Sequence, residues 1–352
     1  MQSHKNYKRI VVKVSSGSLF WNNNIDPYVF GNLVGQVASL SERGHEVIIV
    51  SSGAIALGMH ILGMKDRPKK LSELQAVAAI GQHSLMGKYQ FSFEKRKKNC
   101  AQILLTYDDF SNRKRYCNAR ETISTLWGLK SIPVVNENDT ISTEEIKFGD
   151  NDKLSSLVAS MVKADLLIML SDVDGLLDGQ GKVIKVVDQI SPAIKALASP
   201  TKKQTSVGGM VTKLEAAKIA MDAGIPCVIA NGCKQDIVLS VVKDPENNGT
   251  LFVPKKILDA KGHWMAFGTK PKGRILVDEG ARKALLDKKS LLSVGIVSCS
   301  GHFSGGDIVS ICDNREVEFA RGKAGLALRE LEKVQGKRFS KEIIHRDNIV
   351  IL

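Results

Sequence analysis

Short, unbroken runs of Val, Ile and Leu alternate along this chain with longer segments in which apolar residues recur every three or four positions. The runs predict buried strands and the longer segments predict amphipathic helices. The predicted strands are Arg9–Val14, Glu46–Val50, Ala101–Thr106, Ile132–Asn136, Leu166–Ser171 and Cys227–Ala230. The predicted helices are Pro27–Arg43, Ser72–Lys97, Arg115–Leu129, Lys153–Lys163, Lys213–Ala223 and Gln235–Val242. Because strands without polar alternation are covered on both faces, the pattern predicts an α/β fold, an αβα sandwich with a mainly parallel sheet.

The pattern changes twice further along the chain. Between 174 and 207, glycines surround a short predicted strand at Lys182–Val187, and a segment rich in Ser, Thr and Lys follows, so we expect a hairpin and then a mobile loop. Beyond 271, short predicted strands separated by turn residues indicate a small β-barrel with one or two helices. These strands are Arg274–Asp278, Gly295–Ser298, Asp307–Ile311, Val317–Arg321 and Asn348–Leu352. We expect a first domain over 1–250, a linker over 251–272 and a second domain over 273–352.

Polar residues gather where the predicted parallel strands end. They are Lys13 to Gly17, Ser51-Ser52-Gly53, Asn136 to Asp139 and Ser171-Asp172. In open parallel sheets, ligands bind beyond the carboxyl ends of the strands. The sequence therefore predicts a ligand site at this edge of the first domain.

Two further motifs suggest which chemistry this edge carries. The stretch Val207-Gly208-Gly209-Met210-Val211-Thr212-Lys213 places a glycine pair before a helix that carries a hydroxyl and a lysine in its first turn. Such helix starts attract phosphate groups, and a lysine beside them can meet the charge of a transferring phosphoryl group. The turn Gly149-Asp150-Asn151-Asp152 supplies carboxylates that could serve Mg²⁺ or an ammonium group. Together the two motifs suggest phosphoryl transfer.

Each motif also has a purely structural interpretation. Ser52-Gly53 could be only a tight strand-to-helix turn, and Asn136 to Asp139 could be an Asx turn. The residues of Gly149 to Asp152 could merely cap a helix, and Lys213 could be a solvated lysine. Only the joint occurrence of these motifs at predicted strand ends favours a functional site.

The net charge of +13 raises the possibility of a nucleic-acid partner. The basic residues are dispersed and not interleaved with aromatics, so solvated helix faces explain them better. The six cysteines show no metal-binding spacing, and the ordinary P-loop and protein-kinase motifs are absent. The polar N-terminus lacks a signal-peptide core and no apolar run approaches membrane-spanning length, which predicts a cytoplasmic protein without a membrane partner.

The motifs taken together resemble the glutamate 5-kinase branch of the amino-acid kinase family. They are Val11-Val12-Lys13, Ser52-Gly53-Ala54-Ile55-Ala56-Leu57-Gly58, Asn136-Glu137-Asn138-Asp139, Gly149-Asp150-Asn151-Asp152, Ser171-Asp172 and Gly208-Gly209-Met210-Val211-Thr212-Lys213. The tail resembles a PUA domain through Val277-Asp278-Glu279-Gly280-Ala281 and Gly301-His302-Phe303-Ser304-Gly305-Gly306-Asp307. The resemblance covers about Lys8 to Leu352 and is weakest over Leu177–Ser206.

The resemblance implies the amino-acid kinase fold and ATP-dependent phosphorylation of the L-glutamate γ-carboxylate, the first step of proline biosynthesis. It implies no covalent enzyme intermediate. Lys13 and Lys213 would neutralise the transferring phosphoryl group, and Asp152 would orient both lysines. Glutamate would be held by Ser52, Asp139 and Asn151. The nucleotide site would be lined by Lys13, Ser171, Asp172, Val207, Gly208, Gly209, Met210, Val211, Thr212 and Lys213.

The resemblance further implies ATP and Mg²⁺ as cofactors, a homo-oligomer, and transfer of the product to a glutamyl-phosphate reductase; it assigns no metal ligands. Alternatives are another acyl-phosphate kinase, acting on N-acetylglutamate or carbamate, and an RNA-binding regulator that uses the tail. The tail from 273 carries 14 Lys/Arg and 11 Asp/Glu, a net charge of only +3. One residue departs from the family pattern, because Ser15 stands where a glycine is usual and the nearest glycine is Gly17.

Overall fold

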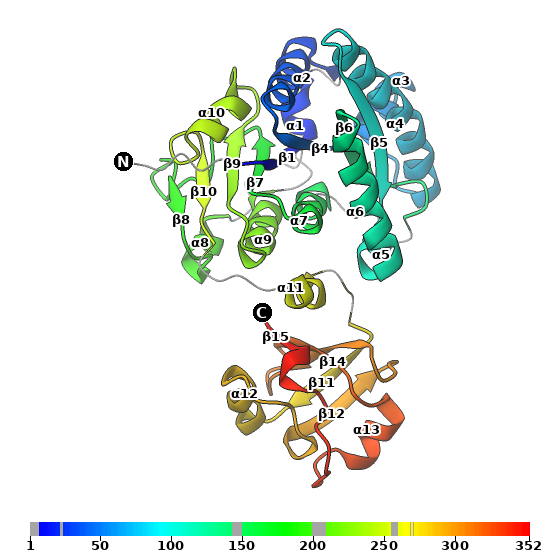
Figure 1. Cartoon of the computed structure of the whole chain (residues 1–352), viewed down its shortest axis with the longest axis vertical. Coiled ribbons are helices and arrows are strands. Elements are labelled where there is room, and N and C mark those ends of the chain that lie inside the picture. Colours follow the sequence, from blue (N-terminus) through cyan, green and yellow to red (C-terminus); the bar gives the residue numbers. More distant parts are fainter. Residues whose placement is uncertain are drawn as a thin grey trace. The chain divides into compact units, whose positions relative to one another are not determined.

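The computed structural model describes residues 7–21, 24–142, 150–198, 209–254, 260–267, 269 and 271–352, and Figure 1 shows the order of its elements. The chain forms two compact units, Met1–Ile257 and Leu258–Leu352. The first contains an eight-stranded sheet and the second a five-stranded sheet. The predicted class, an αβα sandwich with a mainly parallel sheet followed by a small β-barrel domain, is confirmed, and the second domain is built on the five-stranded sheet. The exact limits of the expected linker over 251–272 stay a prediction, because that stretch includes parts of both units.

The large sheet has the strand order β5-β6-β4-β1-β7-β9-β10-β8. Its strands are β1 (Arg9–Val14), β4 (Glu46–Ser51), β5 (Asn99–Leu105), β6 (Ser131–Glu137), β7 (Leu166–Ser171), β8 (Val186–Val187), β9 (Cys227–Asn231) and β10 (Thr250–Phe252). Every pair is parallel except β9 with β10. The six predicted strands are all present, and their carboxyl ends therefore meet at one edge.

Helices cover both faces of this sheet. Side chains alternate along a strand, so Val12 and Val14 of β1 pack with α2 (Pro27–Glu42), α4 (Leu71–Glu94) and α10 (Ile237–Lys243) in one core. Lys13 between them faces the opposite side, where α7 (Asp150–Val162) packs on β1 and α9 (Met210–Asp222) packs on α7. Because side chains alternate between the two faces of the strand, Lys13 lies on the α7 side of an otherwise apolar strand.

Two glycines allow α3 (Ala54–Ile61) and α4 to pack backbone against backbone. A Cβ on Gly58 would overlap the carbonyl group of Val77, and a Cβ on Gly81 would overlap the carbonyl group of Ala54. Substitution at either position would therefore push the helices apart. This contact holds α4 in register with the turn that follows β4.

Some elements escaped the sequence analysis. They are α1 (Ser16–Leu19), β2 (Phe20–Trp21), β3 (Asn24–Ile25), α3, α5 (Tyr107–Ser111) and α8 (Pro192–Leu197). The predicted Lys182–Val187 strand is shorter than expected, because Val183 only bridges to Leu177 while β8 joins the large sheet beside β10. The expected mobile loop contains α8, whose first turn is capped by the hydroxyl of Ser191; residues 199–208 of that loop lie outside the described part of the chain.

The second unit has its own apolar core. Its sheet order is β12-β11-β13-β14-β15, formed by β11 (Gly273–Val277), β12 (Ile296–Gly301), β13 (Ile308–Cys312), β14 (Glu318–Lys323) and β15 (Ile349–Ile351). The helices are α11 (Ala260–Phe267), α12 (Glu279–Leu286) and α13 (Leu328–Val334). Met265 and Ala266 of α11 pack with Ile308 and Val350, and Arg321 donates to the carbonyl oxygens of Ala266 and Thr269. The helix α11 therefore belongs to this unit.

Candidate active site

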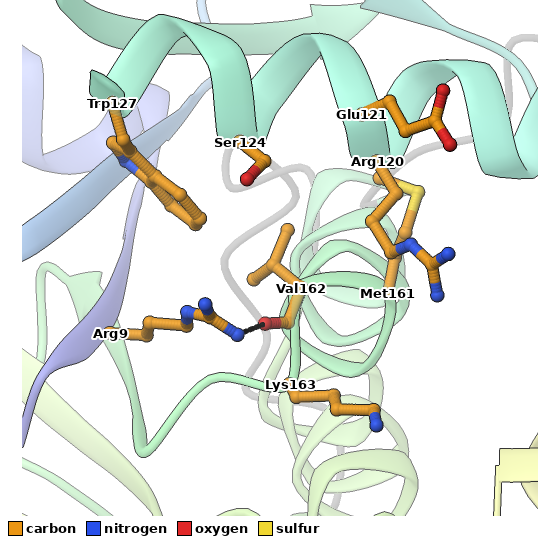
Figure 2. Close-up of a pocket in the computed structure, with 8 residues that line it drawn as sticks. All are labelled: Arg9, Arg120, Glu121, Ser124, Trp127, Met161, Val162 and Lys163. Atoms are coloured by element: carbon orange, nitrogen blue, oxygen red, sulfur yellow. Dashed lines mark hydrogen bonds between the residues drawn. The ribbon is translucent and has the colours of Figure 1, made fainter.

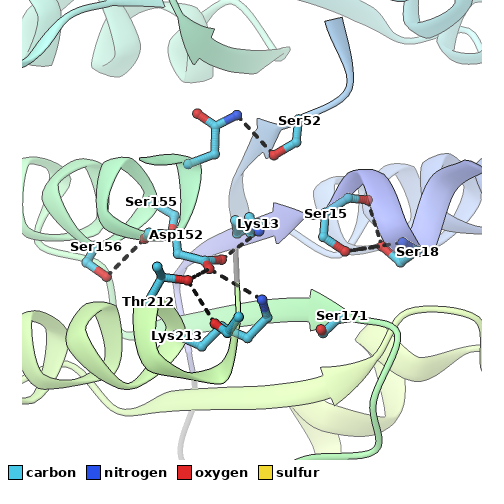
Figure 3. Close-up of polar contacts among 12 residues, drawn as sticks. Lys13, Ser15, Ser18, Ser52, Asp152, Ser155, Ser156, Ser171, Thr212 and Lys213 are labelled. Atoms are coloured by element: carbon cyan, nitrogen blue, oxygen red, sulfur yellow. Dashed lines mark hydrogen bonds and ion pairs between the residues drawn. The ribbon is translucent and has the colours of Figure 1, made fainter. Parts of the chain in front are cut away.

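Two lysines share one carboxylate at the centre of the first unit (Figure 3). The Nζ of Lys13 lies 2.6 Å from Oδ1 of Asp152, and the Nζ of Lys213 lies 3.4 Å from Oδ2. The hydroxyl of Thr212 donates to the same Oδ2 at 2.8 Å. All three charged side chains are about 95% buried or more. The predicted catalytic residues Lys13, Asp152 and Lys213 are thus brought together from β1, α7 and α9.

Small side chains on α7 and α9 make this convergence possible. The hydroxyl of Ser156 on α7 donates to the carbonyl oxygen of Ala216 on α9 at 2.7 Å, and Ala216 itself is fully buried. The hydroxyl of Ser155 donates to the carbonyl oxygen of Asp152 at 2.6 Å. The Ser156 contact joins the two helices, while the Ser155 contact lies within the first turns of α7, and Asp152 there faces Thr212 and Lys213 in the first turn of α9.

The two lysines and Asp152 together carry a net charge of +1 in a site that is buried from water. Burial opposes the charged form of Lys13 and lowers the pKa of its ammonium group, although Asp152 acts in the other direction. Burial also opposes ionisation of Asp152, but Lys13 and Lys213 outweigh it and lower the pKa of this carboxyl group. The site therefore favours an anion, because a bound negative charge would stabilise both ammonium groups.

The first turn of α9 provides backbone donors next to the lysines. The helix begins after Gly209, and no described side chain caps its first N–H groups. Open N–H groups at a helix start bind phosphate oxygens. Val207 and Gly208, which the sequence analysis placed in the nucleotide site, lie outside the described residues, as does Gly149. Met210 and Val211 follow Gly209 in the same turn, and Val211 is about half exposed.

Ser171 and Asp172 occupy the end of β7, next to β1 in the sheet. The hydroxyl of Ser171 donates to Oδ1 of Asp172 at 3.1 Å, and the negative charge of Asp172 acts favourably on Lys13. Asp172 is also the nearest neighbour of Gly17, since a Cβ at Gly17 would lie 3.7 Å from its Cγ. The structure thus brings the predicted nucleotide-site residues of β7 beside the turn after β1.

The turn after β1 carries Ser15 where the family usually has glycine, and its backbone shows no strain at Ser15 or Gly17. Neither Ser15 nor Gly17 has a positive φ, and Gly17 lies within the short helix α1. The hydroxyl of Ser15 accepts from the backbone N–H of Ser18 at 3.2 Å. The sequence suggests that Ser15 keeps a negative φ and that Gly17 compensates through backbone flexibility or an amide contact. The negative φ of Ser15 is confirmed, but Gly17 has no special backbone conformation. The hydroxyl of Ser15 makes a hydrogen bond that a glycine could not make.

A network of amides connects the ends of β4 and β6 with the start of α7. The Nδ2 of Asn151 donates to the Oγ of Ser52 at 3.0 Å, to the carbonyl oxygen of Ser51 at 2.9 Å and to Oδ1 of Asn136 at 2.9 Å. The Oδ1 of Asn151 is buried and has no hydrogen-bond partner among the described residues. Gly53 ends the β4 turn with a φ of 108°, a conformation that requires glycine. The predicted substrate residues Ser52 and Asn151 are therefore in direct contact.

Asp139, the third predicted substrate residue, has its own charged neighbour. Burial lowers the pKa of Arg67, and the carboxylate of Asp139 acts against that shift. No described hydrogen bond joins Asp139 to Ser52 or Asn151. The sequence analysis included Asn136 in the polar cluster 136–139 but gave it no role of its own, and it did not mention Gln82. The Nδ2 of Asn136 donates to Oε1 of Gln82 at 2.7 Å. The position of Asn136, a polar residue near the end of a buried strand, indicated a role at the site. No pattern in the sequence indicated one for Gln82.

The described residues do not build a metal site of their own. No group of three or more His, Cys, Asp or Glu among them could hold a metal ion. The oxygens of Asp152 are engaged by the two lysines and Thr212. Mg²⁺ in kinases is bound largely through substrate phosphates and one or two carboxylates.

A concavity of about 280 Å³ lies elsewhere in the first unit (Figure 2). It is formed near Arg9, at the amino end of β1, by residues of α6 (Arg113–Gly128) and the end of α7. The guanidinium of Arg9 donates to the carbonyl oxygen of Val162 at 3.1 Å. Its Cζ lies over the ring of Trp127, 5.6 Å from the ring centroid. The lysine–aspartate cluster lies at the opposite end of β1, so this concavity is not the candidate active site.

Comparison with known proteins identifies the class of protein that this fold and site define. The sequence pattern of the amino acid kinase family matches residues 8–231, and that of the PUA domain matches residues 273–346. The chain belongs to the amino acid kinase family and carries a PUA domain. Within the described residues, no helix is long and apolar enough to cross a membrane.

Several relatives match nearly the whole chain. A protein named glutamate 5-kinase from Thermoanaerobacter sp. (strain X514) is 43% identical over 98% of both chains. Proteins of the same name from Caldanaerobacter subterraneus subsp. tengcongensis and Syntrophotalea carbinolica are 45% and 42% identical over 98% of this chain and 98% and 97% of theirs. Among solved structures, UMP kinase from Ureaplasma parvum matches with 15% identity and a TM-score of 0.48, over 71% of this chain and 97% of that one.

Proposed function

We propose that this chain is a glutamate 5-kinase, which transfers the γ-phosphoryl group of ATP to the γ-carboxylate of L-glutamate. The products are γ-glutamyl 5-phosphate and ADP, and the reaction is the first step of proline biosynthesis. The observation that carries the proposal is the convergence of Lys13 and Lys213 on Asp152 at the carboxyl edge of the sheet. The full-length relatives named glutamate 5-kinase support the choice of substrate.

The chain's own residues contribute alignment and charge to this chemistry. A carboxylate is already a competent nucleophile, so the enzyme has to align it with the phosphoryl group and relieve the repulsion between the two anions. Lys13 and Lys213 neutralise the charge that spreads over the transferring group, and Asp152 holds both ammonium groups in place. No enzyme-bound covalent intermediate is formed.

The substrates enter from two sides of this cluster. Ser52, Asp139 and Asn151 hold glutamate, and the buried Oδ1 of Asn151 provides an acceptor for its α-ammonium group. The nucleotide would be held by Ser171, Asp172 and the stretch from Val207 to Lys213, which runs into the first turn of α9, and Mg²⁺ would accompany it. When bound, Mg²⁺ supplies further positive charge at the phosphates of the nucleotide.

The α-ammonium acceptor separates this function from the runner-up. In N-acetylglutamate the amine is uncharged and bears an added acyl group, so this compound fits the amide network poorly. Carbamate has no ammonium group at all. The decisive experiment measures ATP consumption with glutamate, N-acetylglutamate, carbamate and aspartate, with hydroxylamine present to trap an acyl phosphate. We expect a hydroxamate from glutamate alone. Turnover with N-acetylglutamate or carbamate and none with glutamate would reject the proposal.

Several properties follow from the proposed function and stay predictions. The product is passed to a glutamyl-phosphate reductase, the enzyme is cytoplasmic, and the chain forms a homo-oligomer. Light scattering coupled to size-exclusion chromatography measures the last of these. RNA binding by the PUA domain has no support beyond a net charge of +3 for residues 273–352, and a gel-shift titration over a range of salt concentrations tests it.

A further inference from the structure

Gln82 lies in the middle of α4, away from every motif that the sequence suggested, yet it ends the amide network of the site. Its Oε1 accepts a hydrogen bond from the Nδ2 of Asn136 at 2.7 Å. Asn136 is 2% exposed, so an unpaired amide there would be costly. The network therefore runs from Gln82 through Asn136 to Asn151.

Backbone groups determine the direction of this network. The backbone N–H of Glu137 donates to Oδ1 of Asn136 at 2.9 Å, so this side of the Asn136 amide must be its oxygen. The amide nitrogen of Asn136 then faces Gln82, which has to present an acceptor. At the other end, the carbonyl oxygen of Ser51 lies 2.9 Å from Nδ2 of Asn151 and requires a donor there.

The consequence is a buried oxygen left over on Asn151. Because Nδ2 of Asn151 is directed at Ser51, Ser52 and Asn136, its Oδ1 lies on the other side of the amide group, where no described residue satisfies it. Buried acceptors without partners are rare in proteins and indicate a site for a ligand donor. The α-ammonium group of the amino-acid substrate is a donor of this kind.

The backbone packing of α3 against α4 fixes the position of Gln82. Gly81, the preceding residue, contacts the backbone of Ala54 and Gly58 so closely that no side chain could intervene. Ala54 is the first residue after the Ser52-Gly53 turn. The acceptor on α4 and the substrate-binding turn after β4 are therefore held as one rigid unit.

We propose that Gln82 is a positioning residue for the amino-acid substrate. Through its hydrogen bond it holds the amide of Asn136, which in turn holds Asn151 with Oδ1 presented to the α-ammonium group. This inference rests on the proposed function. Gln82 itself does not need to touch the reacting atoms, so its loss affects the binding of glutamate and leaves phosphoryl transfer largely unchanged.

The test compares Gln82→Met with Gln82→Glu. Methionine keeps the length and helix preference of glutamine but removes the acceptor, whereas a glutamate carboxylate retains it. We expect Gln82→Met to raise the KM for glutamate by about 5-fold to 10-fold, the effect of one lost hydrogen bond, with kcat and the KM for ATP within about 2-fold of wild type. Gln82→Glu should recover most of the affinity for glutamate.

Gln90→Met serves as the matched control, because Gln90 lies on the exposed side of the same helix and bonds only to Glu94 among the described residues. It should change neither KM. An unchanged KM for glutamate in Gln82→Met would overturn the inference. So would an equal loss of affinity for glutamate in Gln82→Met and Gln82→Glu. A parallel rise in the KM for ATP together with a lower melting temperature would also overturn it. Wild-type enzyme that forms no hydroxamate from glutamate would instead reject the proposed function, so the two failures are distinguishable.

Discussion

The Nζ of Lys13 lies 2.6 Å from Oδ1 of Asp152, in a contact between strand β1 and helix α7 that is almost completely shielded from water. Lys213 from α9 approaches the other oxygen of the same carboxylate. One acidic residue therefore positions two lysines that come from opposite ends of the first unit's sequence. Most of the predictions below test what each member of this cluster contributes.

Replacing Asp152 should affect stability and catalysis together. In Asp152→Asn, two buried ammonium groups lose their counter-charge, which costs about 3–5 kcal/mol when a buried pair is broken. We expect a lower melting temperature, a kcat reduced by on the order of 100-fold, and a larger stabilisation by added ATP or phosphate than in wild type. Calorimetry with and without these anions measures the stabilisation. The control is Asp222→Asn, which changes the partly exposed Lys218–Asp222 pair of α9. Equal anion stabilisation in Asp152→Asn and wild type would contradict the role of Asp152.

Lys213 should act mainly in the transition state. Lys213→Ala removes a preorganised cation beside the transferring group, so kcat should fall by on the order of 100-fold or more while the fold is retained. Steady-state kinetics with ATP and glutamate provide the measurement, and Lys218→Ala, one turn further along α9, is the control. A change confined to the KM for ATP would exclude a transition-state role.

Lys13 should give substrate binding a distinctive pH dependence. Its pKa is lowered by burial, so the folded protein without ligand releases this proton at a lower pH than the unfolded chain does. Between those two pKa values the unfolded state binds more protons, and this group makes stability rise with pH. A bound anion favours the ammonium form, so ATP binding should take up protons at pH values between the lowered pKa of Lys13 in the free protein and the ordinary pKa of a lysine.

Titration calorimetry in two buffers of different ionisation enthalpy measures that proton uptake. Lys13→Arg is the informative variant, because a guanidinium group stays charged over the whole range. We expect proton uptake by wild type below the ordinary pKa of a lysine, and little by Lys13→Arg. The same uptake by both proteins would show that another group titrates.

The turn after β1 allows a paired test of Ser15 and Gly17. Ser15→Gly loses a local hydrogen bond to Ser18, which should lower stability by a few tenths of a kcal/mol and leave kinetics nearly unchanged. Gly17→Ala causes no backbone strain, but its methyl group would lie in van der Waals contact with Asp172. Because this methyl group would occupy space beside Asp172, a proposed nucleotide-site residue, we expect a modestly raised KM for ATP. The melting temperature should be unchanged or slightly higher, since alanine favours a helix more than glycine does. A silent Gly17→Ala together with a marked gain of activity in Ser15→Gly would refute this account.

The PUA domain should be separable from the kinase unit, provided the cut respects α11. Truncation after Ile257 should leave a folded core that phosphorylates glutamate, because every proposed site residue precedes it. Truncation after Lys270 keeps α11 but removes Ile308 and Val350, so Met265 would lose its packing partners. We expect the longer fragment to aggregate more readily, as measured by light scattering. Loss of folding and activity in the shorter fragment would show that the PUA domain is integral to the kinase unit.

The sequence alone determined the architecture and the chemistry of this protein. Unbroken apolar runs specify buried parallel strands because both of their faces must be covered, and the polar residues that follow them necessarily meet at one edge. The pattern places Lys13 and Ser52 at the ends of predicted strands, and it places Asn151, Asp152 and Lys213 at the starts of predicted helices. The individual roles of these residues were implied by the family resemblance. The short helices α3 and α8 were missed because so few residues show no clear period.

Only the tertiary structure decided how these residues are connected. Nothing in the sequence says that Asp152 holds both lysines, or that Gly81 brings α4 against α3 and places Gln82 beside Asn136. Such contacts depend on the packing distance between helices and on the direction of amide groups, which are set by neighbours remote in sequence. Local patterns record which face of an element is buried, but the partner that satisfies each buried polar group is determined by the assembled fold.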